Sequence, residues 1–134
     1  MDDEAFKEQL IRKAYSFALK VITFVESLPR GDWTCQIIGK QLLRSATSIG
    51  ANIVEAQAAS STRDFSNFLT HSLKSANETK FWLGLLRDAG KASLGIVSEL
   101  LRECDELARI LGSSVTTLKA QARSQGAARQ RSEL

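Results

Sequence analysis

Apolar residues recur every three or four positions through most of the chain, and this spacing limits its fold more than any other feature. Such spacing places apolar side chains on one side of an α-helix. The pattern covers four segments, which are residues 3–28, 33–59, 63–89 and 94–121. Four amphipathic helices joined by short turns predict an all-α fold, an antiparallel up-down-up-down four-helix bundle that occupies residues 1–121.

The breaks between these segments carry residues that end or begin helices. Pro29 and Gly31 follow the first segment, because proline cannot continue the helical hydrogen-bond ladder. Asp32 and Thr62 can cap the second and third helices, and Gly90 suits the end of the third. The chain has one proline and eight glycines, which leaves little material for the turns of a β-protein. No strand pattern therefore competes with the helices.

The apolar spacing is lost after about residue 121, where Gln, Ala, Ser, Gly and Arg dominate. We therefore predict that residues 122–134 form a short disordered basic tail. Residues 1–118 hold 14 basic and 14 acidic side chains, so the net charge of +3 lies in the last 16 residues. The candidate contacts with nucleic-acid phosphates are Lys119, Arg123, Arg129 and Arg131. The alternative is a solvated tail that aids solubility.

A polar stripe runs beside the apolar one in the second segment. Its members are spaced four, four and three residues apart, and they are Arg44, Ser48, Asn52 and Glu55. Polar groups beside a buried face are costly unless they form hydrogen bonds. Glu78 and Thr79 in the third segment are candidate partners. We predict that the six residues form a structural polar network between helices or subunits, and the alternative is a functional polar site.

The patterns that would indicate catalysis or metal binding are weak. His71 is the single histidine, and the Glu-x-x-His pairs of di-metal bundles do not occur. Cys35 and Cys104 are far apart and lack the spacing of metal ligands. The sequence also lacks a glycine-rich phosphate loop. We therefore expect a protein that is not an enzyme, with no catalytic residue, no cofactor and no metal.

Two further features concern location and assembly. No apolar run approaches the roughly 18 residues that a membrane span needs. The N-terminus, Met-Asp-Asp-Glu, lacks the basic residues and apolar block of a signal peptide, so we expect a cytoplasmic protein with no membrane contact. The first and third segments are apolar over more of their circumference than one stripe requires, which favours self-association into a homo-oligomer.

The run Arg-Ser-x-x-Ser-Ile-x-x-Asn-Ile-x-Glu over residues 44–55 resembles a bacterial family of four-helix-bundle proteins. Phe65, Ala76, Glu78, Thr79 and Trp82 carry the same resemblance, which covers about residues 5–120. The family was first noticed as open reading frames within intervening sequences of large-subunit ribosomal RNA genes. The resemblance implies a ring-like homopentamer without an established biochemical activity.

A related branch of this family is the accessory protein of diversity-generating retroelements. Its resemblance to the chain implies a second possibility, a nucleic-acid-binding accessory protein that acts with RNA or a reverse transcriptase. The expected partners are then further copies of the chain and RNA or DNA. The sequence thus favours a non-enzymatic oligomeric scaffold. The alternatives are the nucleic-acid-binding accessory protein and an enzyme with its site at the polar stripe.

Overall fold

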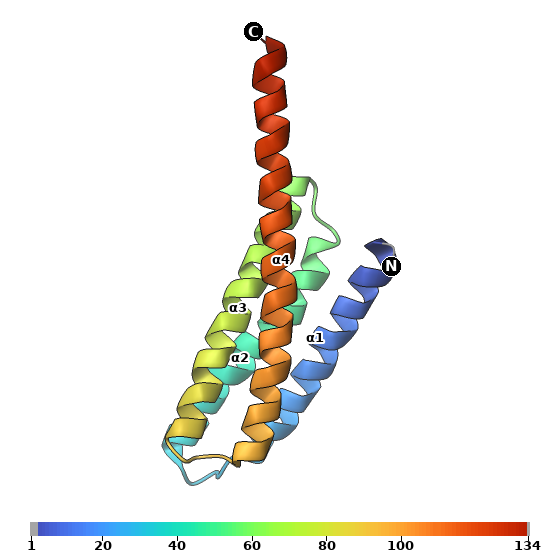
Figure 1. Ribbon diagram of the computed structural model, residues 1–134. Helices are drawn as coiled ribbons and strands as arrows, with labels where there is room; N and C mark the ends of the chain where they lie inside the picture. The colour runs from blue at the N-terminus through green and yellow to red at the C-terminus, as the bar shows by residue number, and fades with distance from the viewer. Residues whose placement is uncertain (1–2, 134) are drawn as a thin grey trace.

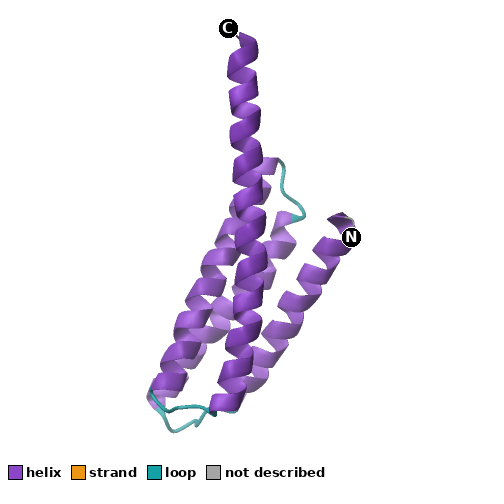
Figure 2. Cartoon of the chain, in the orientation of Figure 1, coloured by secondary structure: helices purple, strands orange, loops and turns teal. Residues whose placement is uncertain are grey.

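The computed structural model of the chain describes residues 3–133, which form four α-helices and no strand. The helices are α1 (Asp3–Glu26), α2 (Trp33–Ala56), α3 (Thr62–Asp88) and α4 (Leu94–Glu133). Figure 1 shows the chain reversing direction at each loop, and Figure 2 shows how short these loops are. Each helix packs against two others, in the cyclic order α1, α2, α3, α4. The predicted all-α fold is confirmed.

The core lies along the axis of the bundle, where the four apolar stripes meet. Its largest fully buried side chains include Phe17 of α1, Leu42 and Ile53 of α2, Leu83 of α3 and Leu111 of α4. Burial of one such side chain stabilises the fold by about 1.5–3 kcal/mol. The apolar spacing of the sequence therefore identifies the residues that hold the helices together.

Two glycines allow α1 and α2 to approach closely. A Cβ atom at Gly50 would lie 3.4 Å from the Cβ atom of Ala14. At Gly39 it would lie 3.2 Å from Cδ1 of Leu28 and 3.4 Å from Cγ1 of Val25. Glycine inside a helix costs about 1 kcal/mol relative to alanine. The close packing of α1 on α2 offsets that cost.

The helix ends follow the predicted breaks with small shifts. The carboxylate of Asp32 caps α2 by accepting a hydrogen bond from the Cys35 backbone N–H at 3.1 Å. The cap of α3 is Ser61 rather than Thr62, because the Ser61 hydroxyl accepts from the backbone N–H of Asp64 at 3.1 Å. Gly90 follows α3 with a φ of 68°, a conformation that glycine adopts without strain.

The C-terminal segment differs from the predicted disordered tail. Helix α4 continues through Glu133, and Figure 1 shows its red end projecting beyond the other helices. Residues 119–132, here called the α4 extension, are exposed throughout. The physical reason is local, since alanine, glutamine and arginine are strong helix formers and no proline interrupts the segment. Residue 134 lies outside the described residues.

Candidate functional site

An ion pair on the surface joins α2 to α3. The Arg44 guanidinium donates to Oε2 of Glu78, and the same oxygen accepts from Nε1 of Trp82 at 2.9 Å. The Gln41 side-chain oxygen also holds the guanidinium, at 3.0 Å and 3.2 Å from two of its nitrogens. The Arg44 side chain is 57% exposed, and exposed pairs contribute only about 0–1 kcal/mol. These bonds fix where the two charges stand more than they stabilise the fold.

Buried hydroxyl groups connect α2 and α3 beneath the surface ion pair. The Thr79 hydroxyl oxygen lies 2.9 Å from the Ser45 hydroxyl and 2.8 Å from the Ser75 carbonyl oxygen. The Ser72 hydroxyl donates to the Ile49 carbonyl at 2.8 Å. Ser45, Ser72 and Thr79 are fully buried. Sequence reasoning did not include Ser45 and Ser72 in the network, although hydroxyls within an apolar stripe are a signal that can find them.

The other predicted members of the polar network stay on α2. The Ser48 hydroxyl donates to the Arg44 carbonyl at 2.8 Å, and the Asn52 amide donates to the Ser48 carbonyl at 2.9 Å. The Glu55 residue is exposed, and its side chain makes no hydrogen bond or ion pair with residues 3–133. The structure therefore brings Arg44 to Glu78 and Thr79 to Ser45. It leaves Ser48, Asn52 and Glu55 as a row along the surface of one chain.

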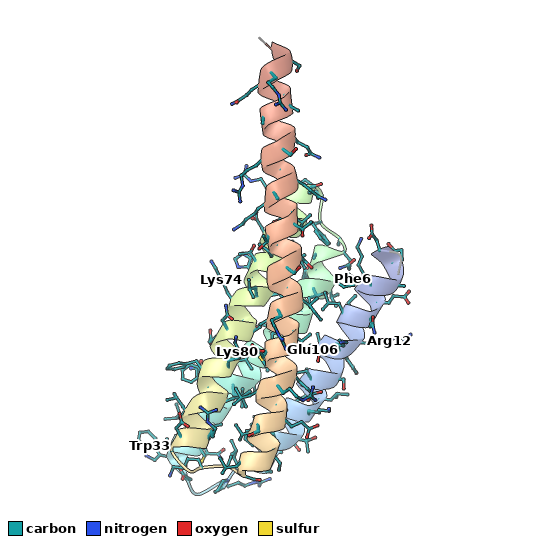
Figure 3. All side chains as sticks on the ribbon, in the orientation of Figure 1. Phe6, Arg12, Trp33, Lys74, Lys80 and Glu106 are labelled. Atoms are coloured by element: carbon teal, nitrogen blue, oxygen red, sulfur yellow. The ribbon has the colours of Figure 1, made fainter. Side chains whose placement is uncertain are left out.

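Exposed apolar side chains lie on one side of the Arg44–Glu78 pair, toward the start of α2 and the end of α3. Trp33 is 74% exposed and Phe81 is 59% exposed, and Ile37 and Leu85 are exposed as well. The helical repeat places Trp33, Ile37 and Arg44 on one side of α2, and Glu78, Phe81 and Leu85 on the adjoining side of α3. Figure 3 shows Trp33 at the end of the bundle that holds the α1–α2 and α3–α4 loops, with its side chain pointing away from the helices. We call these six residues the α2–α3 face.

A groove lies on the other side of the bundle, between α1 and α4. Its volume is about 460 Å³, and Leu19, Phe24 and Ile96 give it apolar walls. Further along the same seam, Lys20 donates to Glu103 at 2.8 Å and Lys13 pairs with Glu106. The hydrogen bond to Glu103 raises the pKa of Lys20, and the one from Lys13 lowers the pKa of Glu106. We call the apolar hollow the α1–α4 groove.

A larger hollow opens at the opposite end of the bundle, beside the start of α1. It measures about 700 Å³, and Phe6, Leu10, Phe65 and Leu118 are among the residues that line it. The Lys7 ammonium stands 5.5 Å from the centre of the Phe65 ring at its rim. The wall is a mixture of apolar side chains, hydroxyls and amides.

The two cysteines are buried thiols. Burial raises the pKa of Cys104 to about 12, and burial also raises the pKa of Cys35 above its ordinary value. Both therefore stay protonated at neutral pH, and the Cys104 thiol lies 3.3 Å from the Ala76 carbonyl. Among residues 3–133, no group of three or more His, Cys, Asp or Glu side chains could hold a metal ion. No helix in that range is long and apolar enough to cross a membrane.

The four basic residues predicted to contact phosphates all lie on the α4 extension. They are Lys119, Arg123, Arg129 and Arg131, and all four are exposed. The first turn of α3 adds Arg63, which lines a groove of about 580 Å³ together with Lys119 and Arg129. Sequence reasoning missed Arg63, because only the packing of α3 against α4 brings it to the basic residues.

The fold and these surfaces define a four-helix-bundle protein whose distinctive side chains lie on its outer faces. The chain belongs to the 23S rRNA-intervening sequence protein family, whose model matches residues 7–113. This confirms the resemblance seen in the sequence. The α4 extension lies beyond the matched residues.

A solved structure from the same family is similar over most of the chain. It is described as a protein with unknown function from the S23 ribosomal protein family, from Bacteroides thetaiotaomicron. It is 34% identical in sequence, and the match covers 82% of this chain and 97% of that one with a TM-score of 0.76. No curated protein matches the chain.

Proposed function

We propose that the protein is a non-enzymatic, cytoplasmic scaffold that assembles into a ring of identical subunits, with five copies as the family resemblance implies. The observation that carries this proposal is the α2–α3 face. Trp33 and Phe81 are large and exposed, and they share this face with Ile37, Leu85 and one ion pair. Single exposed apolar residues are ordinary, whereas a contiguous group of them marks an interaction surface.

The position of a second apolar surface favours a ring over a twofold dimer. A twofold dimer needs one self-complementary patch, whereas a ring needs two different patches that fit each other. The α1–α4 groove lies across the bundle from the α2–α3 face, since α1 and α4 follow α2 and α3 in the cyclic order of packing. One copy can therefore present its face to the groove of the next copy.

The two surfaces also lie at the same height along the bundle. Trp33 begins α2, Ile96 lies in the first turn of α4, and Phe24 lies in the last turn of α1. All three helix ends meet at the end of the bundle opposite the α4 extension (Figure 1). Subunits related by rotation about an axis parallel to the helices require this match in height. Trp33 is the aromatic anchor that we assign to the groove of the neighbouring copy.

The Arg44–Glu78 pair gives the interface its specificity. Removing two charges from water is costly unless their geometry is fixed and further hydrogen bonds satisfy them. Gln41 and Trp82 already hold the two charged groups in place on the free surface. The pair therefore disfavours neighbours that approach in another register.

Size-exclusion chromatography with light scattering tests the proposal. A ring of five copies has a mass of about 74 kDa, five times the 14.7 kDa of one chain. The double variant Trp33→Ser/Phe81→Ser should run as a monomer with an unchanged helical circular dichroism spectrum. The double variant Tyr15→Ser/Val54→Ser is the control, because it removes two exposed apolar side chains outside both surfaces. A wild-type protein that is monomeric at micromolar concentration overturns the scaffold proposal.

A second candidate function is nucleic-acid binding, as an accessory protein that works with RNA or a reverse transcriptase. The α4 extension supports it, because Lys119, Arg123, Arg129 and Arg131 project from the bundle without an acidic residue between them. A ring would place several extensions at one end, and linked weak contacts gain affinity through avidity.

Binding of a labelled single-stranded RNA at two salt concentrations tests this candidate. Phosphate contacts release counterions, so binding must weaken steeply as salt rises. A chain ending at Leu118 lacks the α4 extension and should lose the interaction. Binding that is insensitive to salt, or that survives this deletion, argues against the extension as the site.

A further inference from the structure

We propose that the α4 extension is a reader of double-stranded DNA that lies in the major groove, with Lys119, Arg123 and Arg131 directed at the duplex. This inference rests on the second candidate function, nucleic-acid binding, and names the class of nucleic acid. It concerns a segment that lies outside the residues matched by the family model.

The first support is shape. Residues 119–132 continue α4 for about 21 Å at 1.5 Å per residue, and Figure 1 shows that no other helix accompanies them. The major groove of B-DNA is about 12 Å wide and about 8.5 Å deep, and it admits an α-helix. The major groove of A-form RNA is too narrow and deep for side chains to read. A single projecting helix therefore fits duplex DNA and not duplex RNA.

The second support is charge. Residues 107–132 contain no aspartate or glutamate, so nothing on this half of α4 repels a phosphate. Steps of about 100° per residue place Lys119, Arg123 and Arg131 within an arc of about 120°. Ala120 and Ala127 fall within the same arc, and their small side chains let the helix backbone approach the duplex. Arginine is the residue that most often reads guanine in the major groove.

A third support is the basic groove at the root of the extension. Arg63 of α3 lines this groove with Lys119 and Arg129. Arg129 lies outside the arc of Arg123 and Arg131, on the side of the extension that faces α3. When the arc enters the major groove, Arg63 and Arg129 are placed to contact the phosphates of the strand beside it. Phosphate contacts of this kind position a reading helix without carrying sequence information.

The root of the extension is also rigid. Leu111 and Val115 are buried and Leu118 is half-buried in the turns just before the extension. No proline interrupts α4, so the bundle fixes the direction in which the helix leaves. Beyond Leu118 the residues are exposed and only some of them line the groove against α3, so the outer turns are free to fray in water. A bound duplex should therefore raise the helix content of the protein.

The competing explanation is that these basic residues only stabilise the end of α4. Positive side chains in the last turns of a helix interact favourably with its dipole, and they also aid solubility. That explanation requires no preference among nucleic acids and no difference between the two sides of the extension. Both points can be measured on the full chain.

The first measurement is fluorescence anisotropy with labelled probes of one mixed sequence of roughly 20 base pairs, about two turns of B-DNA. The probes are the DNA duplex, the RNA duplex and a single DNA strand. We expect the DNA duplex to bind at least tenfold more tightly than the other two at 50 mM salt. Raising the salt to 200 mM should weaken binding roughly 100-fold, because about four phosphate contacts give a slope near −3.6 in log K against log salt.

The second measurement compares two variants that lower the net charge by the same amount. Arg123→Ala/Arg131→Ala removes two charges from the proposed reading side. Ala128→Glu/Ser132→Glu adds two negative charges on the side that faces away from it, at positions that do not line the groove of Arg63 and Arg129. We expect the first variant to bind the DNA duplex at least tenfold more weakly than wild type, and the second to lose threefold or less. Circular dichroism and light scattering should show the same fold and assembly for both.

The outcomes separate this inference from the function on which it rests. Equal affinity for all three probes, or equal losses in the two variants, overturns major-groove reading while nucleic-acid binding stands. No binding to any probe at 50 mM salt overturns both. An unchanged helix content on addition of the DNA duplex counts against the inference as well, because the extension gains its support from the bound duplex.

Discussion

The two parts of helix α4 differ in what stabilises them. Up to Leu118 the helix packs its apolar stripe into the core through Val97, Cys104, Leu111 and similar residues. From Lys119 to Ser132 every residue is exposed, and the helix preference of these residues is the main support of the helix. One continuous helix is therefore held by tertiary packing up to Leu118 and mainly by local helix preference beyond it. The packed part of α4 belongs to the bundle core, and the exposed part lies outside it.

The largest expected effect comes from a substitution in the core of the packed bundle. Phe17→Ala removes a fully buried ring from the core, and such truncations cost about 3–5 kcal/mol. Urea unfolding followed by circular dichroism measures the change. Deletion of residues 119–134 should alter the same unfolding free energy by less than about 0.5 kcal/mol, as changes on exposed surfaces do. A deletion that destabilises the bundle as much as Phe17→Ala would abolish the distinction between the two parts.

Glycines in the two parts should respond with opposite signs. Gly50→Val forces a larger side chain against Ala14, and overpacking of this kind costs about 1–3 kcal/mol. Gly126→Ala meets nothing within 4 Å, and alanine favours a helix by about 1 kcal/mol over glycine. Thermal melting should show the loss for Gly50→Val. Amide hydrogen exchange should show slower opening of the extension for Gly126→Ala, with no change in melting temperature.

The buried and exposed hydroxyls of the predicted polar network should differ in a similar way. Thr79→Val removes a buried hydroxyl that bonds to Ser45, which should lower the unfolding free energy by about 1–3 kcal/mol. Ser48→Ala removes a hydroxyl that bonds only to its own helix, so we expect a change within about 0.5 kcal/mol. Urea titrations measure both changes, and titrations of Ser45→Ala and Thr79→Val/Ser45→Ala complete the cycle that gives the coupling between the two hydroxyls. Equal changes in unfolding free energy for Thr79→Val and Ser48→Ala would show that burial does not determine how much each hydroxyl stabilises the fold.

The smallest effect concerns the ion pair between Lys91 and Asp32, which joins the α3–α4 loop to the start of α2. Lys91 donates to Asp32 at 2.7 Å, and this bond lowers the pKa of Asp32 below its ordinary value of 3.8. The pair therefore stabilises the fold above about pH 4, and its contribution is lost as the pH falls through the lowered pKa. Melting temperatures measured from pH 6 to pH 2 should fall less steeply for Asp32→Asn than for wild type. Parallel curves for the two proteins would assign the acid sensitivity to other carboxylates.

The number and extent of the bundle helices could be read from the sequence because they depend on local spacing. Predicted boundaries lie within three residues of those observed for the first three helices, for example residues 33–59 against Trp33–Ala56. The end of the fourth could not be placed, since loss of the apolar stripe removes the packing signal but not the helix preference of the residues. The apolar spacing identifies helices that have a buried face, and it does not identify a helix that is exposed on all sides.

The candidate sites were predictable only where the partners lie along one helix or share a recognisable motif. Arg44 and Glu78 were named as partners, and the structure joins them. Ser45 and Ser72 were hidden within apolar stripes, where a small hydroxyl passes for a core residue. Arg63 meets Lys119 and Arg129 only through the packing of α3 on α4, which no local pattern encodes.

The continuity of α4 has a mechanical consequence. Its 40 residues form one rod about 60 Å long, and roughly a third of that length extends outside the bundle as a lever arm. The inner end of the rod carries Ile96, a wall of the α1–α4 groove. A sideways load on the base of the extension therefore acts on the same continuous helix that forms the groove wall.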